Sequence, residues 1–370
     1  MAADQAIIDM MPVLDRVKRH QRARKTVRGT LLHDPWKVRT VWISDTHLTS
    51  LNALPAELTQ FFYHLDARIF FLLGDIVDCW KLGIHSHDKL GQLLNVSGYT
   101  SEEQAVLDSI FRQRRVIYVP GNHDEVFRDF DGYSIGNASI AYEPIHKTKD
   151  GKHLLNIHGD IWDNIIRHHR WLGLLGTATK EFACQAIIML PKWRKDWRIN
   201  RALEFARLPM LPRWSLSQVI ASSDNVTYTD TYRLNLMDYA IDRNRRIFEQ
   251  RKNEADDAKT PYVDIVTGAH THVADRYKFR SPIDPETGDV MGPEFVEYLN
   301  TGHWTGPKDA ESREGLKYPT CTAVVEHMDG RLAHVRWVPR KGIEQFHPEG
   351  EGDVWVDIEA LRAKVAAKNT

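Results

Sequence analysis

The feature that most constrains the fold is a series of five short apolar runs, each of which ends in Asp, Asn or His. The runs are "VRTVWISDTHL", "ARIFFLLGDIVD", "RRVIYVPGNHD", "HLLNIHGD" and "VDIVTGAHTH". Short apolar runs bounded by turn residues are typical of buried strands. Between them lie the helix candidates "LPAELTQFFYHLD" and "TSEEQAVLDSIFRQR", the second with Thr100 or Ser101 as its N-cap. Strands that alternate with helices predict an α/β fold.

The polar residues at these strand ends should meet at one edge of the sheet, where sites in parallel-type sheets gather. Residues two apart in an extended strand share a face. We therefore expect Asp45 to lie on the same face as His47, and His270 on the same face as His272. Carboxylate, amide and imidazole groups without a thiolate favour manganese, iron, magnesium or zinc. The strand ends supply Asp45, His47, Asp75, Asp78, Asn122, His123, Asp124, His158, Asp160, His270 and His272.

These ligands are too many for one ion, so we expect two divalent cations, with manganese as the first candidate and iron, zinc or magnesium as alternatives. Two metals roughly 3.5–4 Å apart can clamp a phosphoryl group during in-line displacement. One carboxylate would bridge them, and a bridging water would become hydroxide near neutral pH. The pattern therefore indicates hydrolysis of a phosphoester or pyrophosphate bond, with this hydroxide attacking phosphorus.

The motifs "SDTH", "GDIVD", "GNHD", "IHGD" and "GAHTH" resemble the motif series of the calcineurin-like metallophosphoesterases. The presence of "IHGD", followed by "NTGHW" and "VEHMDG", is closer to the bacterial branch related to UDP-2,3-diacylglucosamine pyrophosphatase than to the protein phosphatases. The resemblance covers about residues 40 to 338. It implies a sandwich of two mixed β-sheets flanked by helices, with a dinuclear metal centre at the top.

The resemblance implies the two sets of metal ligands, and the chemistry of the neighbouring side chains suggests the other roles. His123 is expected to be catalytic, stabilising the transition state or protonating the leaving oxygen, which calls for a group that titrates near pH 7. Asp124 is expected to orient His123. Asp160 is expected to support the site, and Asp78 either joins the site or caps the turn beneath it. One metal would be held by Asp45, His47, Asp75 and His272, and the other by Asp75, Asn122, His158 and His270, with Asp75 bridging.

Two positions depart from the family pattern. Ala269 directly precedes His270 where Gly is usual, although Gly268 lies one residue earlier. Because Ala is small, we expect little effect beyond a different local turn. His303 stands in "NTGHW" where Asp is expected. This histidine either removes a supporting contact or adds an imidazole to the site.

The substrate is expected to be a lipid-linked phosphoester. The sequence does not decide which class of lipid it carries. The UDP-2,3-diacylglucosamine pyrophosphatase branch usually has Arg where this chain has His123. The His form is typical of phosphodiesterases and of relatives that act like phospholipase C. A UDP-diacylglucosamine-like lipid and a glycerophospholipid are therefore both candidates, and a soluble phosphodiesterase or nuclease is an alternative. A non-catalytic metal-binding scaffold would lack Asp or His at the strand ends, and none is missing here.

The chain divides into a basic N-terminal extension at 1–38, a metallophosphoesterase domain at 39–340, and a tail with a helix at 341–370. The long interval between His158 and His270 predicts a helical cap insertion at about 165–250, rich in Trp, Arg and Leu. Such a composition suits lipid tails and an anionic membrane surface, and a cap packed by its own Trp and Leu is the alternative. The expected substrate-binding residues are Arg194, Trp197, Arg198 and, before the insertion, His87.

The last third predicts antiparallel strands in "EFVEYLNTGHW", "TCTAVVEHMDG" and "RLAHVRWV", with Asp329-Gly330 as a hairpin turn. The net charge of -1 provides no general attraction to nucleic acid, which is not an expected partner. Three widely spaced cysteines and the lack of a signal-peptide pattern predict a cytoplasmic protein. Peripheral contact with the inner face of the membrane is compatible with the predicted cap, and nothing in the sequence indicates an obligate protein partner.

Overall fold

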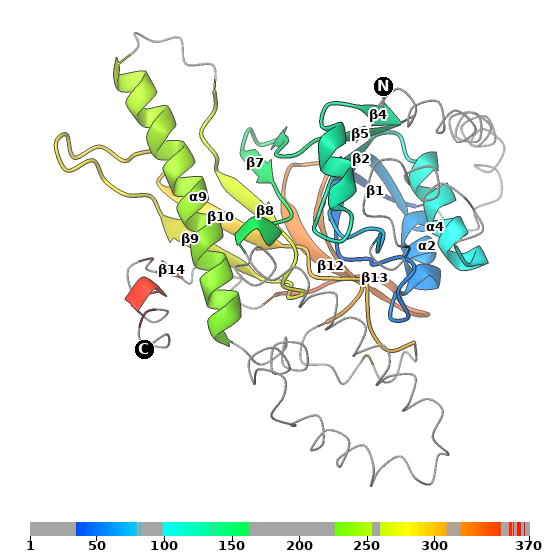
Figure 1. Ribbon diagram of the computed structural model, residues 1–370. Coiled ribbons are helices and arrows are strands. Elements are labelled where there is room, and N and C mark those ends of the chain that lie inside the picture. The colour runs from blue at the N-terminus through cyan, green and yellow to red at the C-terminus, as the bar shows by residue number, and fades with distance from the viewer. Residues whose placement is uncertain are drawn as a thin grey trace, which may run out of the picture.

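The computed structural model in Figure 1 describes residues 35–79, 82, 99–135, 137–162, 226–253, 260–308, 313, 319–348, 355–356, 358, 361–363 and 366. Several of the expected features lie outside these residues. They are the first 34 residues, most of the predicted cap insertion, and the four expected substrate-binding residues His87, Arg194, Trp197 and Arg198. The described residues form two β-sheets with helices on their outer faces, so the expected fold class is confirmed.

The first sheet has the strand order β13-β12-β11-β1-β2-β3-β5-β4. Its centre is parallel, because β1 pairs with β2, β2 with β3 and β3 with β5 in the same direction. The remaining strands are antiparallel to their neighbours, as the pattern of hairpins near the end of the chain predicted for β11 and β12. The bounds are β1 (Trp36–Ile43), β2 (Leu65–Leu73), β3 (Val116–Val119), β4 (Ser134–Ile135), β5 (Ala138–Ile140), β11 (Thr322–Glu326), β12 (Leu332–Val338) and β13 (Gly342–Gln345).

The second sheet has the strand order β14-β9-β10-β8-β7-β6. Strand β8 is parallel to both β7 and β10, whereas β9 and β6 run antiparallel to their partners β10 and β7. The parallel strand β14 lies beyond β9 at one edge. The bounds are β6 (Ile145–Lys147), β7 (His153–Asn156), β8 (Ile265–Gly268), β9 (Arg276–Arg280), β10 (Phe295–Asn300) and β14 (Trp355–Val356).

The expectation that "EFVEYLN" is an antiparallel strand is confirmed on one side only, because the segment pairs antiparallel with β9 and parallel with β8. This segment is β10, which lies in the second sheet and runs parallel to β8. Its end is held there by polar groups: Nδ2 of Asn300 donates to the carbonyl of Ala269 at 2.9 Å, and the amide of Thr301 donates to the carbonyl of Gly268 at 3.2 Å. Strand propensity predicted the element but could not select its neighbour.

The two sheets pack face to face over an apolar layer. Trp42 of the first sheet stacks on Phe71 with ring centroids 5.6 Å apart, and both are buried in a cluster with Leu154 and Ile265 of the second sheet. Nε1 of Trp42 donates to Oδ1 of Asn156 at 2.6 Å, which satisfies a polar atom in this apolar layer. This contact fixes the ends of β1 and β7 relative to each other, close to the polar residues that follow them.

Helices cover the outer faces, as Figure 1 shows. The outer side of the first sheet shares a buried cluster with α2 (Pro55–Tyr63) and α4 (Ser101–Arg112), and the second sheet shares one with α9 (Val226–Asn253). Two short 3-10 helices, η3 (Glu125–Phe130) and η4 (Asp160–Trp162), follow the polar ends of β3 and β7. The predicted cap insertion thus ends in a helix that packs against the sandwich.

The start of α4 is fixed as the sequence predicted. Thr100 is the N-cap: its side chain accepts from the amide of Glu103 at 3.2 Å, and the Glu103 carboxylate accepts from the amide of Thr100 at 2.8 Å. The other oxygen of Glu103 accepts from the amide of Thr49 at 2.6 Å. The capping box therefore also anchors the loop that carries Asp45 and His47.

Residues from outside the range 39–340 also belong to the two sheets. Strand β1 begins at Trp36, two residues before the predicted end of the N-terminal extension. The segment 341–370, expected to be a tail with a helix, contributes strands β13 and β14, one to each sheet. No helix among the described residues has both the length and the apolar character needed to cross a bilayer.

Candidate metal centre

The polar strand ends meet at one edge of the sandwich. Asp45 and His47 follow β1, Asp75 follows β2, and Asn122 follows β3 in the first sheet. His158 follows β7, and His270 and His272 follow β8, in the second. The ligating atoms of Asp45, His47 and His272 all lie within 4.8 Å of one another, and those of Asp75, His158 and His270 form a second group within the same limit. Both groups combine residues of the two sheets.

Asp75 faces both groups through a single oxygen. Its Oδ2 lies 3.5 Å from Nε2 of His158 and 3.8 Å from Nε2 of His47. Next to it, Oδ1 of the buried Asn122 side chain lies 3.4 Å from Nε2 of His158. Nδ1–H of His158 donates to the carbonyl of Leu73 at 2.8 Å, which directs Nε2 toward the carboxylate.

Asp45 is the centre of the first group. Its Oδ1 lies 3.2 Å from Nε2 of His272, and Nε2 of His272 lies 3.4 Å from Nε2 of His47. Its Oδ2 accepts a hydrogen bond from the amide of His270 at 3.2 Å. Asp45 thus presents one oxygen to the imidazoles and uses the other to hold the turn after β8.

The charges in this cluster are strongly coupled. Burial opposes the charge on Asp75, but the imidazoles of His158 and His123 outweigh it and hold the pKa of that carboxyl well below its usual range. Burial also opposes the charge on His158, yet the Asp75 carboxylate raises the pKa of His158 to about 10. Burial, together with the charge on His123, lowers the pKa of His47 to about 4, so this ring is neutral and can act as a ligand at neutral pH.

Five of the seven candidate ligands adopt a left-handed backbone conformation. Their φ angles lie between 42° and 66°, a region that costs residues other than Gly about 1–2 kcal/mol each. Backbone strain of this kind persists only where the surrounding structure enforces it, and it concentrates at functional sites. The residues are Asp45, His47, Asp75, His270 and His272.

Gly121 explains the "PGN" turn that precedes the polar residues after β3. A Cβ atom at this position would lie 2.3 Å from Oδ1 of Asp75 and 2.8 Å from Nε2 of His158. Both neighbours are candidate ligands, so neither can move aside without losing its place. The turn therefore requires a residue without a side chain.

His123 lies beside the first group and is paired with Asp78. Nδ1 of His123 is 3.1 Å from Oδ1 of Asp78, and its amide donates to Oδ1 of Asp75 at 2.8 Å. Burial opposes a charge on the ring, but the carboxylates of Asp75 and Asp78 raise the pKa of His123 to about 9. The ring lies edge-on to His47 with centroids 4.6 Å apart. His123 is therefore a protonated hydrogen-bond donor at neutral pH in this arrangement.

Asp124 has a different role from the one expected. Its Oδ2 accepts hydrogen bonds from the amide of Ile76 at 2.7 Å and the hydroxyl of Tyr118 at 2.5 Å, and its Oδ1 accepts from the amide of Gly121 at 2.6 Å. These bonds tie the turn after β3 to the loop after β2. Because residue 124 opens the 3-10 helix η3, its side chain turns back into the turn. The carboxylate paired with His123 is that of Asp78.

Asp160 supports the loop after β7. Both of its oxygens accept hydrogen bonds from Nη2 of Arg128 at 2.7 Å, which joins η4 to η3. Arg128 also lies over the ring of Tyr142, 5.8 Å from its centroid. Neither metal-ligand group contains Asp160.

Both departures from the family pattern lie at the site. Ala269 is fully buried, and its amide donates to the carbonyl of His158 at 3.1 Å, so the turn after β8 is formed without Gly at this position. The ring of His303 is stacked on that of His272, with centroids 5.0 Å apart and planes 15° apart. Of the two alternatives for this histidine, the structure favours an additional imidazole at the site.

One residue that supports the site, Tyr232, was not identified from the sequence. Tyr232 of α9 donates from its hydroxyl to the carbonyl of His158 at 3.0 Å, and its ring lies 6.1 Å from that of His270. A Cβ atom on Gly159 would come within 1.9 Å of this hydroxyl, which explains the glycine in "IHGD". No local motif marks Tyr232, because only the packing of α9 brings it to the site.

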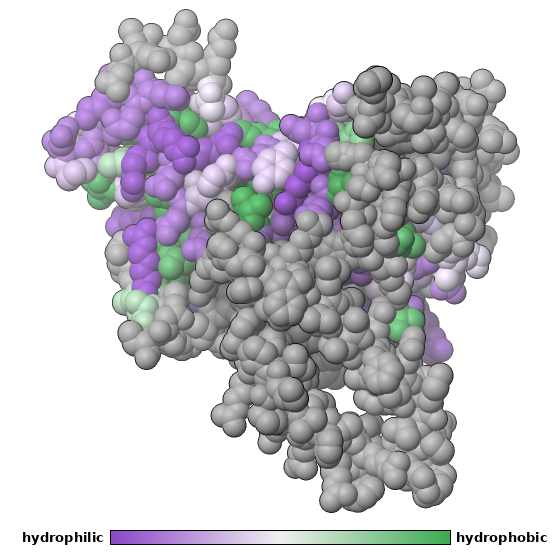
Figure 2. All heavy atoms as spheres, in the orientation of Figure 1, coloured by the Kyte–Doolittle hydropathy of each residue, from purple (hydrophilic) through white to green (hydrophobic). Residues whose placement is uncertain are grey.

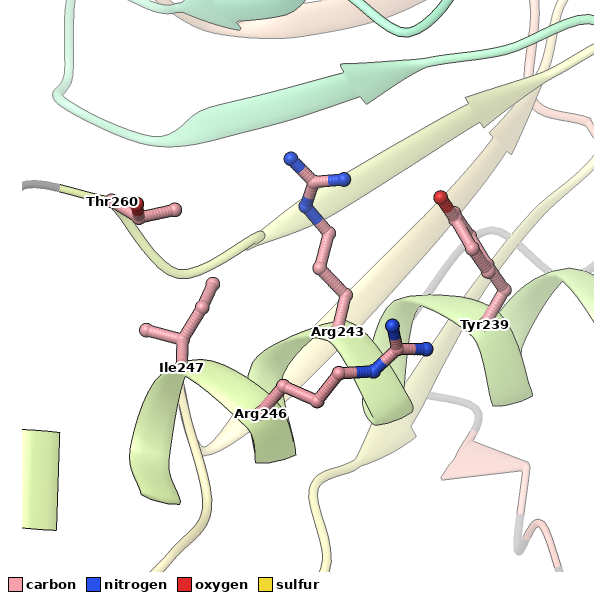
Figure 3. Close-up of a pocket in the computed structure, with 5 residues that line it drawn as sticks. All are labelled: Tyr239, Arg243, Arg246, Ile247 and Thr260. Atoms are coloured by element: carbon pink, nitrogen blue, oxygen red, sulfur yellow. The ribbon is translucent and has the colours of Figure 1, made fainter. Parts of the chain in front are cut away.

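A separate hollow on α9 is shown in Figure 3. It is lined by Tyr239, Arg243, Arg246, Ile247 and Thr260. The hydroxyl of Tyr239 donates to Oε2 of Glu143 at 2.7 Å, and Nη1 of Arg243 lies 3.5 Å from the same oxygen. None of the candidate metal ligands lines this hollow, so it is distinct from the metal centre.

The donor set fits divalent cations. It offers carboxylate and amide oxygens and imidazole nitrogens, the ligands preferred by manganese, iron and zinc, and the described cysteines Cys79 and Cys321 belong to neither group. A third possible group of His47, Asp78 and His123 overlaps the first group at His47. We interpret its other two members as the His123–Asp78 pair.

Comparison with known protein families matches residues 38–274 to the calcineurin-like phosphoesterases. The match covers more than half of the chain, begins within β1 and ends just after the turn that follows β8. It therefore contains every candidate metal ligand. No curated protein matches the chain.

Proposed function

The chain belongs to the calcineurin-like phosphoesterase family and is a metal-dependent phosphoester hydrolase, and we propose that it uses two divalent cations to cleave a lipid-linked substrate. The observation that carries the dinuclear proposal is the position of Asp75. One oxygen of this carboxylate faces an imidazole of each ligand group, 3.5 Å from His158 and 3.8 Å from His47. A carboxylate in this position can bridge two cations.

The proposed ligands follow the two groups. The two cations would supply Lewis acidity for a water molecule and for the phosphoryl oxygens. Manganese is the first candidate, and iron, zinc or magnesium would fit the same donors. One cation would be held by Asp45, His47, Asp75 and His272, and the other by Asp75, Asn122, His158 and His270.

His123 is the proposed catalytic residue. Asp78 holds the ring through Nδ1, and the carboxylates of Asp75 and Asp78 raise the pKa of His123, which favours the protonated ring. The other ring nitrogen can then donate to the leaving oxygen or to a phosphoryl oxygen. Asp75 accepts the amide of His123, which couples the position of the catalytic ring to that of the bridging carboxylate. Asp124 is proposed to support catalysis indirectly, by holding the turn in shape.

The lipid-linked substrate is a proposal supported by the sequence. The segment at about 165–250 is rich in Arg and Trp, and we propose that Arg194, Trp197 and Arg198, together with His87, contact a UDP-diacylglucosamine-like lipid or a glycerophospholipid. Cleavage of a glycerophospholipid would be phospholipase-C-like. We also propose a cytoplasmic location with peripheral contact at the inner face of the membrane.

A soluble phosphodiesterase is the second candidate function. Figure 2 shows that, on the face drawn, the described residues are mostly hydrophilic and the hydrophobic ones are scattered among them. Among the described residues, the exposed large hydrophobic side chains Leu51, Tyr133 and Met328 lie far apart in the sequence, and Ile283 and Val290 pair across one antiparallel bridge. Scattered exposed apolar residues are normal for a protein surface and provide no lipid site by themselves.

A substrate panel tests these proposals. Full-length protein loaded with Mn²⁺ is assayed against bis-p-nitrophenyl phosphate, phosphatidylcholine, a UDP-diacylglucosamine analogue and a cyclic nucleotide, and its metal content is measured. We expect two metals per chain, cleavage of the chromogenic diester, and faster turnover of one lipid than of the cyclic nucleotide. An intact diester and no bound metal would instead support a non-catalytic scaffold.

A variant separates the lipid proposal from the chemistry. Replacing Arg194, Trp197 and Arg198 together by Ala should abolish lipid turnover and leave cleavage of bis-p-nitrophenyl phosphate within about twofold of wild type. Equal lipid turnover in the variant and the wild type would refute the lipid contact. Preferential cleavage of the cyclic nucleotide would establish the soluble phosphodiesterase.

A further inference from the structure

The side chain of the candidate ligand His272 is more exposed than those of His47 and His158. Its side chain is 36% exposed, whereas that of His158 is 1% exposed. Nδ1–H of His158 donates to the carbonyl of Leu73, but within the described residues no hydrogen bond meets Nδ1 of His272. A histidine that binds a metal usually donates from its second nitrogen to a carbonyl or carboxylate, which fixes the plane of the ring. The ring plane of His272 must therefore be fixed by a contact other than a hydrogen bond at Nδ1.

The ring of His303 makes a stacking contact that can fix the plane of the His272 ring. It lies nearly parallel to the ring of His272, with planes 15° apart and centroids 5.0 Å apart. Offset parallel stacking is a favourable arrangement for aromatic rings at this distance. A partner stacked on one face restricts the rotation of His272 about its side-chain torsions while its Nε2 remains directed at Asp45, 3.2 Å away.

His303 can act as a support because it is itself held firmly. Its Nδ1 lies 2.9 Å from Oγ1 of Thr305, its amide donates to Oγ1 of Thr322 at 3.2 Å, and its carbonyl accepts from the amide of Cys321 at 2.8 Å. The next residue, Trp304, is fully buried, and its amide donates to the carbonyl of Asp45 at 3.1 Å. The loop that carries His303 is thus bonded to the backbone of another ligand of the same group.

We propose that His303 is a positioning residue that fixes the ring plane of His272 by stacking, and that it thereby sets the affinity for the cation held by Asp45, His47 and His272. This inference rests on the proposed dinuclear function. A preorganised ligand loses less conformational freedom when a metal binds. The flat face of the ring carries this role, and Thr305 keeps that face in place.

The experiment compares metal affinities in the full-length chain after EDTA treatment. Binding of Mn²⁺ is measured by isothermal titration calorimetry for the wild type and three variants. His303→Ala removes the stacked ring, His303→Phe keeps a flat ring without nitrogens, and Thr305→Val removes the hydroxyl at nearly constant size. His64→Ala is the matched control, because it removes an imidazole packed on Trp337, with centroids 4.9 Å apart, away from the strand ends.

We expect His303→Ala to weaken one of the two Mn²⁺ equivalents by about 10–100-fold and to leave the other unchanged. His303→Phe should stay within about threefold of wild type, Thr305→Val should lie between these variants, and His64→Ala should match wild type. The apparent KM for Mn²⁺ in diester cleavage should rise in His303→Ala, and kcat at saturating Mn²⁺ should change less than twofold.

Three results would overturn the inference. Wild-type affinity at both sites in His303→Ala would remove the proposed role. An equal loss of Mn²⁺ affinity in His303→Phe and His303→Ala would show that the ring nitrogens, rather than the stacked face, support His272. Loss of both equivalents with a lowered melting temperature of the metal-free protein would make His303 a general structural residue. If the wild type itself binds no Mn²⁺, the dinuclear proposal fails. The titration of the wild type therefore distinguishes failure of the dinuclear proposal from failure of the His303 proposal.

Discussion

Asp78 lies three residues after Asp75 and Asp124 lies directly after His123, and their hydrogen bonds give these two aspartates separate roles. Asp78 meets Nδ1 of His123, whereas Asp124 accepts from two backbone amides and one hydroxyl. The two residues have the same chemistry, so their roles depend on where the backbone directs each side chain. Substitution by Asn should separate these roles.

We expect His123→Ala to lower kcat for bis-p-nitrophenyl phosphate by about 10²–10⁴-fold with two metals still bound, because the ring donates to the reacting oxygens. Asp78→Asn should lower kcat by about 10–100-fold by removing the ionic partner of the ring. The double variant should be no slower than His123→Ala, since both changes remove one function. Kinetics and metal analysis measure these effects.

Asp124→Asn is the control for that series. It weakens a buried carboxylate that accepts three hydrogen bonds, so it should lower the free energy of unfolding by about 2 kcal/mol or more. A stable Asp124→Asn protein with the kinetic defect expected of Asp78→Asn would show that the assignment is reversed.

His334 provides a residue-scale prediction about pH. The ring is fully buried on β12, and Nε2–H donates to the carbonyl of Asn300 at 2.9 Å. Burial, aided by the charge of Arg276, lowers the pKa of His334 to about 4. The ring is therefore neutral in the folded protein, whereas the unfolded chain takes up a proton below its ordinary pKa of about 6.5. Its contribution to stability is complete above that pH and is lost as the pH falls toward 4.

Between pH 7 and pH 5 this residue should reduce the free energy of unfolding by about 2 kcal/mol. In His334→Gln, which keeps a donor but cannot titrate, that part of the acid sensitivity should disappear. Urea denaturation of the metal-free proteins at both pH values measures the difference. Parallel pH dependences of the two proteins would exclude this role of His334.

At the scale of single residues, the sequence predicted the seven candidate ligands as one group, because each stands at the end of an apolar run. It could not predict that Asp78 rather than Asp124 would pair with His123, since side-chain direction in a turn depends on local backbone angles. Nor could it predict Tyr232 or the stacking of His303 on His272, because these contacts depend on packing between distant segments.

At the scale of elements, the strands and helices were largely predictable, but their neighbours were not. Apolar runs predicted β1, β2, β3, β7 and β8, and the capping residues predicted where α4 begins. The sequence did not predict that β10 lies beside β8, because a run of apolar residues is compatible with either sheet. Its position is decided by polar contacts such as those of Asn300, which involve residues far away in the sequence.

Helix α9 is attached to the second sheet by a buried ion pair. Nε of Arg233 donates to Oδ2 of Asp275 at 2.8 Å, Nη2 donates to the same oxygen, and the guanidinium lies 4.3 Å from the centroid of Tyr277. Both charged residues are buried. Removing one partner of a buried pair leaves the other charge poorly compensated. Without Asp275, Arg233 keeps the acidic partner Asp230, whose Oδ1 lies 3.2 Å from Nη1.

We therefore expect Asp275→Asn to lower the free energy of unfolding by about 3 kcal/mol. The control is Arg245→Ala, which breaks the exposed pair with Asp242 in the same helix and should cost less than about 0.5 kcal/mol. Both values come from urea denaturation at neutral pH. Similar costs for the two variants would mean that the buried pair contributes no more than an exposed one.

At the scale of the whole molecule, each ligand group joins the two sheets. Asp45, His47, Asp75 and Asn122 come from the first sheet, and His158, His270 and His272 come from the second. Cations bound between them would therefore connect the halves of the sandwich. Ligands that bind only the folded state increase stability by mass action.

We expect EDTA to lower the melting temperature of the wild type by about 5–10 °C for each cation removed. A ligand present at about one hundred times its Kd adds about 2.7 kcal/mol, and a large chain gains a few degrees for each kcal/mol. Calorimetry with and without Mn²⁺ measures this shift. In Asp75→Asn the shift should shrink, because the proposed bridge is lost, and an unchanged shift would argue against a bridging Asp75.

The pairing of β1 with β11 has a consequence for synthesis of the protein. Thr40 on β1 donates to Glu326 on β11, across 286 residues of chain. At about 5–20 residues per second, ribosomes need roughly 15–60 seconds to make that interval. During this time one edge of β1 has no partner strand, although all seven candidate ligands have been made before β11 appears. Protease sensitivity of nascent chains stalled before and after residue 326 should fall sharply once β11 can close the sheet.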